Sequence, residues 1–319
     1  MAVSRGPLLV ALRALGLGDL LTGIPALRGL RKAFPRHRIV LAAPAALAPI
    51  ALLSGAVDDV ADTRPLEPLH PSLHSPQVAV NLHGRGPESH RVLRATRPGR
   101  LIAFANRDVR DTAGMPVWRP DEHEVVRWCR LLSESGIPAN PRDLELDAPR
   151  APLPPHGEGA TVLHPGAASP ARRWPAERYA AVARAERRRG RTVIVTGSEA
   201  EIGLARSVSA AAGLEHEAVL AGQTDVLGLA ALVASAARVV CGDTGVAHLA
   251  TAFGTPSVVL FGPTSPGLWG PPERRRHRVL WAGSQGDPHG DAPDPGLLRI
   301  QVDDVLTALD ELDVRERAA

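Results

Sequence analysis

The sequence predicts an α/β protein with two doubly wound, Rossmann-like domains that face each other across a cleft. Short aliphatic and β-branched runs alternate with helical segments, and the alternation occurs twice along the chain. A stretch dense in proline and glycine, 148–159, separates the two series and is the expected linker. We therefore expect an N-terminal domain over 1–150 and a C-terminal domain over 151–319.

The first series begins with a buried strand and ends with an amphipathic helix. Its expected strands are Leu8–Leu12, Arg38–Ala43, Val78–Leu82 and Arg100–Phe104, and its expected helices are Leu20–Phe34, Ala45–Ser54 and Glu122–Ser135. Gly136 follows the last helix at the position of a C-terminal cap.

The second series repeats the pattern after the linker. Its expected strands are Thr161–His164, Thr192–Thr196, Val239–Val240 and Ser257–Phe261, and its expected helices are Pro175–Arg189, Leu227–Ala236 and the closing helix Val302–Leu312. Another helix is expected after the turn at Gly197. In doubly wound sheets, ligands bind beyond the carboxyl ends of the strands, and the glycine-bearing turns of this chain lie at those ends.

Composition excludes several classes of protein. Lys32 is the only lysine and lies in no Gly-Lys-Ser/Thr loop, so neither a Walker-type ATP site nor a pyridoxal phosphate site is predicted. The net charge of +3 gives no case for a nucleic-acid partner. No Cys, His or carboxylate cluster has metal-ligand spacing and no D-x-D pair occurs, so no metal is expected.

Location follows from similar arguments. Cys129 and Cys241 are far apart in sequence, which is typical of a reduced, cytoplasmic protein. No signal peptide and no apolar run of spanning length is found, so membrane contact is expected to be peripheral at most. The basic run 273–278 is either a solvated loop or a contact with the inner face of an anionic membrane.

The turn Gly242–Gly245 joins a buried strand to a short helix and is the most informative segment of the chain. Such a turn offers free backbone N–H groups and the positive end of a helix dipole, which together bind anions such as phosphate. In this interpretation Thr244 and the amide of Gly245 face the ligand, Asp243 holds the turn, and His248 leans toward the same anion. The alternative is ordinary capping, with Asp243 as the N-cap.

A second glycine-bearing turn follows the first strand and contains Gly18 and Asp19. It is not a dinucleotide fingerprint, because the third glycine comes too late, at Gly23, and no acidic residue ends the second strand. Asp19 has two interpretations: it is the N-cap of the next helix, or it is a carboxylate placed for general-base chemistry.

These motifs resemble those of glycosyltransferase family 9, the ADP-heptose:lipopolysaccharide heptosyltransferases. The donor-site pattern D-T-G-x-x-H, followed by a strand and a G-P-T-x-P turn, is matched by 243–248 and 262–266. The N-terminal pattern R-x-x-x-x-G-D-x-x-x-x-x-P is matched by Arg13, Gly18, Asp19 and Pro25.

The resemblance implies a GT-B fold and an inverting, metal-independent transfer of a sugar from a nucleotide-diphospho-sugar, with ADP-heptose favoured and no cofactor. In the family the aspartate at Asp19 is taken as the base that deprotonates the acceptor hydroxyl. Residues implied at the donor are Arg172 (commonly lysine in the family), Ser198, Asp243, Thr244, Gly245 and His248. Residues implied on the acceptor side are Arg13, Gly18, Asn81 and His83, with Asn81 in place of the family's acid.

Two points stay open at this stage. The resemblance suggests that Glu199 or Glu201 binds the donor ribose, and the alternative for Glu199 is a simple charge in the first turn of the next helix. The acceptor is a glycan, a glycolipid or a small molecule. Two other functions fit the same fold: a nucleotide-sugar 2-epimerase that needs no acceptor, and a non-catalytic sugar-nucleotide sensor. Asp19 in its glycine turn argues against the sensor.

Overall fold

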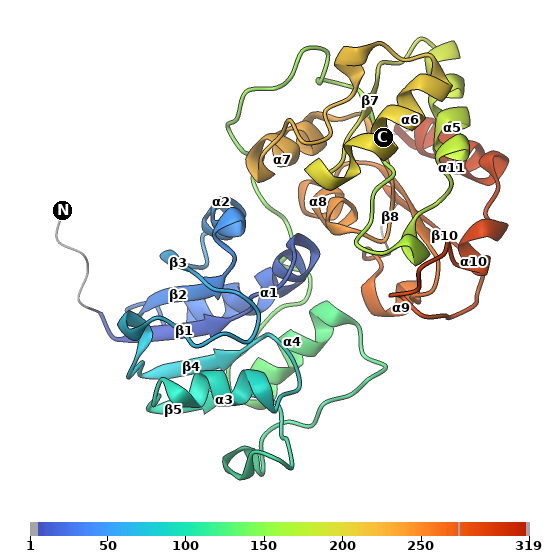
Figure 1. Ribbon diagram of the computed structural model, residues 1–319. Coiled ribbons are helices and arrows are strands. Elements are labelled where there is room, and N and C mark those ends of the chain that lie inside the picture. The colour runs from blue at the N-terminus through green and yellow to red at the C-terminus, as the bar shows by residue number, and fades with distance from the viewer. Residues whose placement is uncertain (1–5, 274, 317–319) are drawn as a thin grey trace. The chain divides into compact units, whose positions relative to one another are not determined.

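The computed structural model describes residues 6–273 and 275–316, with side chains described as far as Asp313. The chain forms two compact units, the first ending at Leu146 and the second beginning at Asp147. Each unit holds one five-stranded, fully parallel sheet with helices packed on it (Figure 1). The predicted fold class, with two parallel doubly wound sheets, is therefore confirmed.

The sheet of unit 1 has the strand order β3-β2-β1-β4-β5. Its strands are β1 (Leu8–Leu12), β2 (Arg38–Ala43), β3 (Asp59–Asp62), β4 (Val78–Asn81) and β5 (Arg100–Ile102). Its α-helices are α1 (Leu17–Ala33), α2 (Ala48–Leu53), α3 (Glu88–Ala95) and α4 (Glu124–Glu134). Strand β1 is central, and four of its five residues are completely buried, as its aliphatic sequence predicts.

The sheet of unit 2 has the order β10-β9-β8-β6-β7. Its strands are β6 (Thr161–His164), β7 (Val193–Val195), β8 (Arg238–Gly242), β9 (Ser257–Phe261) and β10 (His277–Trp281). Its α-helices are α5 (Ala176–Arg188), α6 (Ile202–Ala212), α7 (Val226–Ser235), α8 (Gly245–Phe253), α9 (Pro266–Trp269), α10 (Pro295–Arg299) and α11 (Val302–Glu316).

Both sheets reverse their winding direction beside their first strand, which is where doubly wound proteins bind ligands. In unit 1 the reversal lies between β1 and β4, whose last residues Leu12 and Asn81 are paired. In unit 2 it lies between β6 and β8, where His164 is paired with Cys241. The turns that follow these four strands are the motifs that the sequence analysis selected.

Two expectations about local structure need correction. Helix α1 begins at Leu17, three residues earlier than expected, and contains Pro25 within it. Strand β10 occupies part of the basic run, which is therefore not simply a loop: His277 is buried and its Nδ1 lies 2.9 Å from the Ser257 hydroxyl. Position 274 of that run lies outside the described residues.

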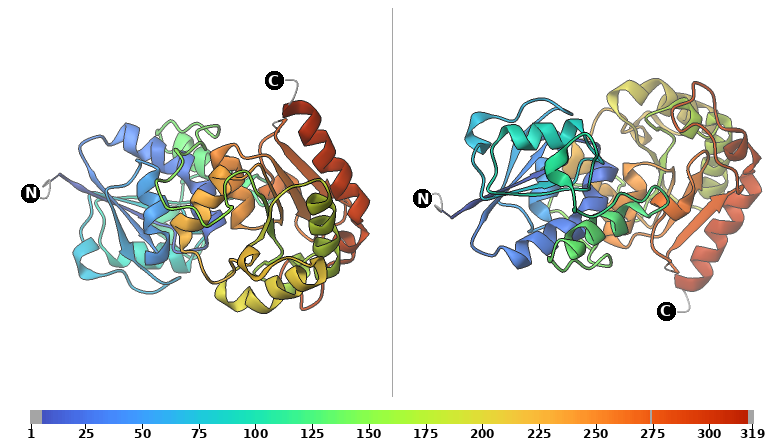
Figure 2. Two further views of the ribbon diagram at one scale, coloured as in Figure 1. Left: turned by 90° about the horizontal axis from the view of Figure 1, so that it is seen from above. Right: turned by 90° about the horizontal axis from the view of Figure 1, so that it is seen from below.

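A buried ion network joins α11 to the amino ends of β6 and β8. Glu186 is completely buried and lies 2.8 Å from both the Thr161 hydroxyl and Nη1 of Arg191. Asp313 of α11 pairs with Arg191 and, at 2.5 Å, with Arg238. The C-terminal helix is thereby fixed along the sheet of unit 2, as the red helix in Figure 2 shows.

Within the described residues, no helix combines the length and the apolar character that crossing a bilayer requires.

Candidate functional site

The candidate site of unit 2 lies where β6 and β8 end. A short 3₁₀ turn, Pro170–Arg172, brings Arg172 to the turn after β8, where its Nη1 donates a hydrogen bond to the Asp243 carbonyl at 3.3 Å. The same nitrogen lies 3.9 Å from the Asp243 carboxylate. Gly242 is needed at this approach, because a Cβ there would lie 3.0 Å from the Arg172 carbonyl oxygen.

Helix α8 starts directly at this site. Its N-cap is Thr244, so the capping alternative that made Asp243 the N-cap is wrong. Thr244 makes no side-chain capping bond, and the first N–H groups of a helix have no partner within it. The positive end of α8 and the Arg172 guanidinium are therefore next to each other, which is the arrangement that binds an anion.

Two polar atoms at this site are buried and lack a hydrogen-bond partner among the described residues, namely Nε of Arg172 and Oγ1 of Thr244. The Thr244 hydroxyl does interact with the thiol of Cys241, which is a weak hydrogen-bond acceptor. Buried polar groups are normally paired, so unsatisfied groups at a sheet's ligand-binding edge indicate where a polar ligand would bind.

The loop after β7 is ordered by one of its own glutamates. The Glu201 carboxylate accepts hydrogen bonds from the backbone N–H and the hydroxyl of Ser198, both at 2.8 Å. Glu201 also lies against Gly166, where a Cβ would come within 2.2 Å of the carboxylate. The Ser198 hydroxyl thus binds Glu201, whereas Glu199 is exposed in the first turn after Ser198.

Arg13 is the centre of the candidate site of unit 1 and is completely buried. Its guanidinium group donates to the backbone carbonyls of Asp19 and Leu82, which follow β1 and β4 respectively. It also lies 3.1 Å from the Thr22 hydroxyl. Gly23 makes room for it, because a Cβ there would lie 2.9 Å from Cδ of Arg13. Arg13 therefore holds the two turns together and is not itself available to a ligand.

Asp19 lies in the first turn of α1, one residue after Gly18, and is not its N-cap; Gly16 is. The carboxylate accepts a hydrogen bond from the Gly16 N–H at 3.3 Å and lies 3.6 Å from Nη2 of Arg13. Its side chain is 29% exposed. Burial raises the pKa of this carboxyl above its usual value, Arg13 opposes the rise, and Glu124 adds to it. A partly accessible carboxylate with a raised pKa is a suitable general base.

Asn81 orders the turn after β4 and is completely buried. Its amide nitrogen lies 2.9 Å from both the Ser89 hydroxyl and Nδ1 of His90, and its oxygen accepts the His83 N–H at 2.9 Å. Because Nε2 of His90 donates to the Phe104 carbonyl at 2.7 Å, its Nδ1 is the acceptor for Asn81. Asn81 thus uses both ends of its amide to order the turn after β4.

His83 is half-buried, and its Nδ1 has no hydrogen-bond partner in the described part of the chain. Burial, and to a smaller extent the charge of Arg13, lower the pKa of His83 and so favour the neutral ring. A neutral imidazole can accept a hydrogen bond from a hydroxyl at one ring nitrogen and donate one at the other.

With this geometry established, the chain can be compared with known proteins. The family model described as "Glycosyltransferase family 9 (heptosyltransferase)" matches residues 107–294, more than half of the sequence. The chain belongs to glycosyltransferase family 9. The matched region contains every donor-side residue named above, whereas Arg13, Asp19 and Asn81 precede it.

Relatives within family 9 agree in sequence and fold. The chain is 34% identical over 163 residues to lipopolysaccharide heptosyltransferase 2 of Escherichia coli K12, an alignment that covers 48% of this chain and 47% of that protein. The aligned region therefore spans about half the length of this curated relative.

Solved structures of the family share the fold over nearly the whole chain. The structure titled E. coli ADP-heptose lps heptosyltransferase II has a TM-score of 0.77 and 22% identity, and the match covers 97% of this chain and 99% of that one. The E. coli heptosyltransferase WaaC with ADP has a TM-score of 0.72 and 17% identity over 96% of this chain and 99% of that one.

Sequence reasoning did not find Glu124, which is the partner of Arg13 in this family 9 protein. The Glu124 carboxylate is 3.1 Å from Nη2 of Arg13 and accepts the indole N–H of Trp128 at 2.7 Å. The two residues of the ion pair are 111 positions apart, so no local pattern connects them. The only signal was a glutamate in the first turn of α4, next to its N-cap His123.

His248 lies in the first turn of α8. Its ring contacts Trp269 edge to face, with centroids 5.9 Å apart. Trp269 is held in α9, directly after the G-P-T-x-P turn. His248 of the first part of the donor-site motif therefore contacts the short helix that begins at Pro266, the last residue of the second part.

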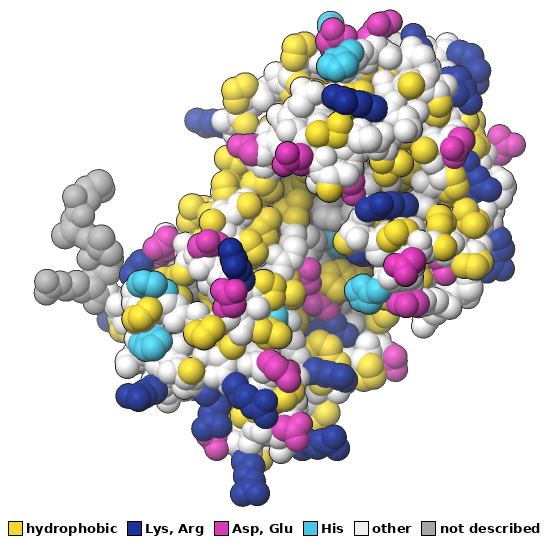
Figure 3. All heavy atoms as spheres, in the orientation of Figure 1, with side chains coloured by type: hydrophobic (Ala, Val, Ile, Leu, Met, Phe, Trp, Pro, Cys, Tyr) yellow, Lys and Arg dark blue, Asp and Glu magenta, His cyan; other side chains and the backbone are white. Residues whose placement is uncertain are grey.

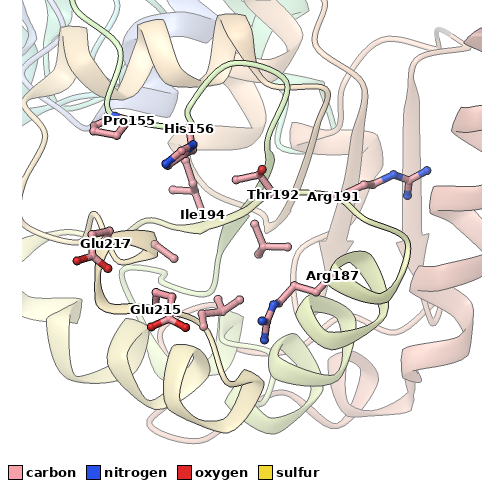
Figure 4. Close-up of a pocket in the computed structure, with 11 residues that line it drawn as sticks. Pro155, His156, Arg187, Arg191, Thr192, Ile194, Glu215 and Glu217 are labelled. Atoms are coloured by element: carbon pink, nitrogen blue, oxygen red, sulfur yellow. The ribbon is translucent and has the colours of Figure 1, made fainter.

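One cavity of about 370 Å³ lies elsewhere in unit 2, near the amino end of β7 (Figure 4). Its walls include the backbone or stems of Arg187 and Arg191, whose guanidinium groups are bonded to the Gly213 carbonyl at 2.6 Å and to Glu186 at 2.8 Å. Because the cavity is at the opposite end of the strands from the motifs, we do not assign it to the donor.

Charge is mixed on the surface. Basic and acidic side chains are interspersed on the face shown in Figure 3.

Among the described residues, no group of three or more His, Cys, Asp or Glu side chains is arranged to hold a metal ion.

Proposed function

We propose that this protein transfers heptose from ADP-heptose to a hydroxyl of a lipopolysaccharide core acceptor. Membership of family 9 supports a glycosyltransferase activity, and the names of its relatives, an ADP-heptose and a lipopolysaccharide heptosyltransferase, suggest the donor and the acceptor class. The observation that carries the proposal is the pair of unsatisfied buried atoms, Arg172 Nε and Thr244 Oγ1, at the positive end of α8.

In this proposal the donor diphosphate binds in unit 2. The Arg172 guanidinium and the first N–H groups of α8 neutralise the charge that develops on the departing diphosphate, as preorganised donors do in other transferases. Thr244 and Gly245 contact the phosphate oxygens, and His248 contacts the neighbouring sugar. Since these donors supply positive charge themselves, we expect no divalent metal to be required.

The acceptor is activated in unit 1. Asp19 removes the proton of the acceptor hydroxyl as its oxygen attacks the anomeric carbon, and the bond from that carbon to the diphosphate oxygen breaks. Attack from the face opposite the leaving group inverts the anomeric configuration. Arg13 and Asn81 hold the turns that carry Asp19 and His83. The reaction takes place at the inner face of the membrane, where such an acceptor is found.

The test is a direct assay with purified protein. ADP-heptose is incubated with lipopolysaccharide isolated from a heptose-deficient strain, and ADP release and the mass of the product are measured. One heptose added per acceptor, with the anomeric configuration opposite to that of the donor, is expected.

In further reactions, UDP- or GDP-sugars replace ADP-heptose as the donor. A last reaction contains UDP-N-acetylglucosamine and no acceptor. Turnover in the last reaction alone would establish an epimerase instead. Binding of ADP-heptose without turnover on any acceptor offered would favour a sensor.

A further inference from the structure

One guanidinium nitrogen of unit 1 lies between two carboxylates. Nη2 of Arg13 is 3.1 Å from Oε1 of Glu124 and 3.6 Å from Oδ1 of Asp19. The two acids differ in exposure, because the side chain of Glu124 is 7% exposed and that of Asp19 is 29% exposed. Only one of them is therefore accessible to a substrate, and the other acts inside the protein.

Glu124 is held at both of its oxygens. Oε1 also accepts the indole N–H of Trp128 at 2.7 Å, and Oε2 accepts a hydrogen bond from Nη1 of Arg127. Arg127 is in turn bonded to the carbonyl oxygens of Arg119, Pro120 and Glu122. A carboxylate fixed in this way gives Arg13 a rigid partner at a defined distance.

Arg13 cannot move away from this arrangement. Besides its bonds to the backbone of Asp19 and Leu82, its guanidinium group faces the ring of Trp128 at 4.9 Å from the centroid. The Trp128 ring therefore contacts Arg13 through its face and Glu124 through its N–H. Arg13, from the turn after β1, and Glu124 and Trp128, from α4, therefore form one packed group.

We propose that Glu124 is a positioning residue for Asp19 that acts through Arg13. This inference rests on the proposed function, in which Asp19 is the general base. Without Glu124, the whole charge of Arg13 would be directed at Asp19, which would draw that carboxylate into a tight ion pair and weaken it as a base. With Glu124 in place, Arg13 binds mainly to Glu124 and to backbone carbonyls, so the Asp19 carboxylate stays available to an acceptor hydroxyl.

Few charges act on Asp19, so the effect can be isolated. They are Arg13, on the turn after β1, and Glu124, on α4. Arg127 touches Glu124, and His83, on the turn after β4, is affected by Arg13. Arg13 favours ionisation of Asp19 and Glu124 opposes it, which gives opposite expectations for their removal.

The experiment compares Glu124→Gln with the parent chain. The amide keeps the size and an oxygen acceptor but removes the negative charge. The titration of the Asp19 carboxyl is followed by carbon NMR on protein labelled at aspartate carboxyls, with Asp19→Asn to assign the signal. We expect the Asp19 titration to move to lower pH and the acid limb of kcat to move with it. We also expect kcat to fall by roughly 10- to 100-fold, as small misplacements of catalytic groups do, with the donor KM unchanged.

Glu134→Gln is the matched control. Glu134 lies on the same helix and pairs with Arg119 and Arg130, away from Asp19. We expect neither the Asp19 titration nor the acid limb to move in this variant. If Glu124 served stability alone, Glu124→Gln would lower the melting temperature without changing the pH at which Asp19 titrates.

A second comparison is needed if the Glu124→Gln variant does not fold because the buried charge of Arg13 has lost its partner. Arg13→Gln and the double variant Arg13→Gln/Glu124→Gln remove the charges together, which buried sites tolerate better. Arg13→Gln should move the Asp19 titration to higher pH. Because Glu124 acts through Arg13, the added Glu124→Gln should then move the titration much less than Glu124→Gln does alone.

An Asp19 titration that does not respond to Glu124→Gln in the parent chain, or that responds equally with and without Arg13, would overturn the inference. The proposed function fails in a different way, namely when no sugar is transferred or when the acid limb does not follow the Asp19 titration. The NMR measurement needs no activity, so the two failures are distinguishable.

Discussion

The guanidinium group of Arg172 donates to the carbonyl oxygen of Asp243 at 3.3 Å while its Nε stays buried without a partner among the described residues. One nitrogen of the guanidinium group, Nη1, is thus held by the protein, whereas another, Nε, has an unused N–H donor. This arrangement holds the positive charge at the start of α8 before any ligand arrives, so binding does not have to order a flexible arginine.

Arg172→Ala should therefore weaken the binding of ADP and of ADP-heptose. A charged hydrogen bond to phosphate contributes roughly 1.5–3 kcal/mol, which corresponds to about a 10- to 150-fold rise in Kd by calorimetry. Arg206→Ala, at an exposed arginine on α6, is the control and should bind as the parent does. Equal affinities of the two variants would remove Arg172 from the donor site.

Thr244→Val separates binding from stability. The hydroxyl has no normal hydrogen-bond partner in the described structure, so its replacement by a methyl group of similar shape should leave the melting temperature unchanged or slightly higher. Donor affinity should fall by roughly 1 kcal/mol, the usual contribution of one neutral hydrogen bond. A loss of stability with unchanged affinity would show that the hydroxyl serves the fold.

Asp19→Asn should lower the transfer rate by roughly 10²–10⁴-fold, the usual contribution of general acid–base catalysis. Donor affinity should stay unchanged, because in the proposed function the donor binds in unit 2. Near-normal turnover with a proven acceptor would exclude Asp19 as the base.

The same substitution has a predictable effect on stability. Because the pKa of Asp19 is raised in the folded state, its ionisation lowers stability as the pH rises from the unfolded-state pKa through the folded-state pKa. Asparagine avoids this cost and can still accept the Gly16 N–H, so the melting temperature at neutral pH should be equal or higher. In the parent protein, the acid limb of kcat should lie above the pH expected for an ordinary aspartate.

Transfer should continue after treatment with EDTA. The cationic groups of the proposed donor site are Arg172 and the start of α8, and neither depends on a metal. The measurement is the rate of ADP release before and after chelation. Loss of activity that magnesium restores would contradict the prediction.

Both cysteines should be unreactive in the folded protein. Burial, with a smaller contribution from Asp143, raises the pKa of Cys129 to about 12, and burial also raises that of Cys241. Since the thiolate is the reactive form, a thiol reagent such as DTNB should titrate neither residue rapidly in the native state and both in denaturant. A fast-reacting native thiol would show that one of these regions opens readily.

Much of the site could be predicted because its residues directly follow strands. The end of a buried strand is visible in the sequence as the end of an aliphatic run, and the topology of a doubly wound sheet then brings the following turns together. The turns that carry Asp243 and Asp19 were identified in this way, whereas Arg172 and Asn81 were selected by the resemblance to family 9. The bonds inside the turns were less predictable, since Thr244 and not Asp243 caps α8, and Asp19 lies within α1.

The remaining contacts depend on packing between distant segments. Glu124 meets Arg13 because α4 packs on α1, and His90 meets Asn81 because α3 follows β4. Neither contact can be predicted from the spacing of residues in the sequence. A buried arginine does predict that a buried acid exists, because an unpaired charge in the core is too costly, but it does not say where in the chain that acid lies.

The linear order of the site has an evolutionary consequence. In the proposed function the donor-side residues lie between Arg172 and His248 and the acceptor-side residues between Arg13 and Glu124. In the described structure no helix or strand lies from 135 to 160. A single recombination event in that segment would therefore exchange one complete half-site for another without cutting either sheet. Under the proposed function, such an exchange would give the chain a new acceptor half while the half that binds the nucleotide is kept intact.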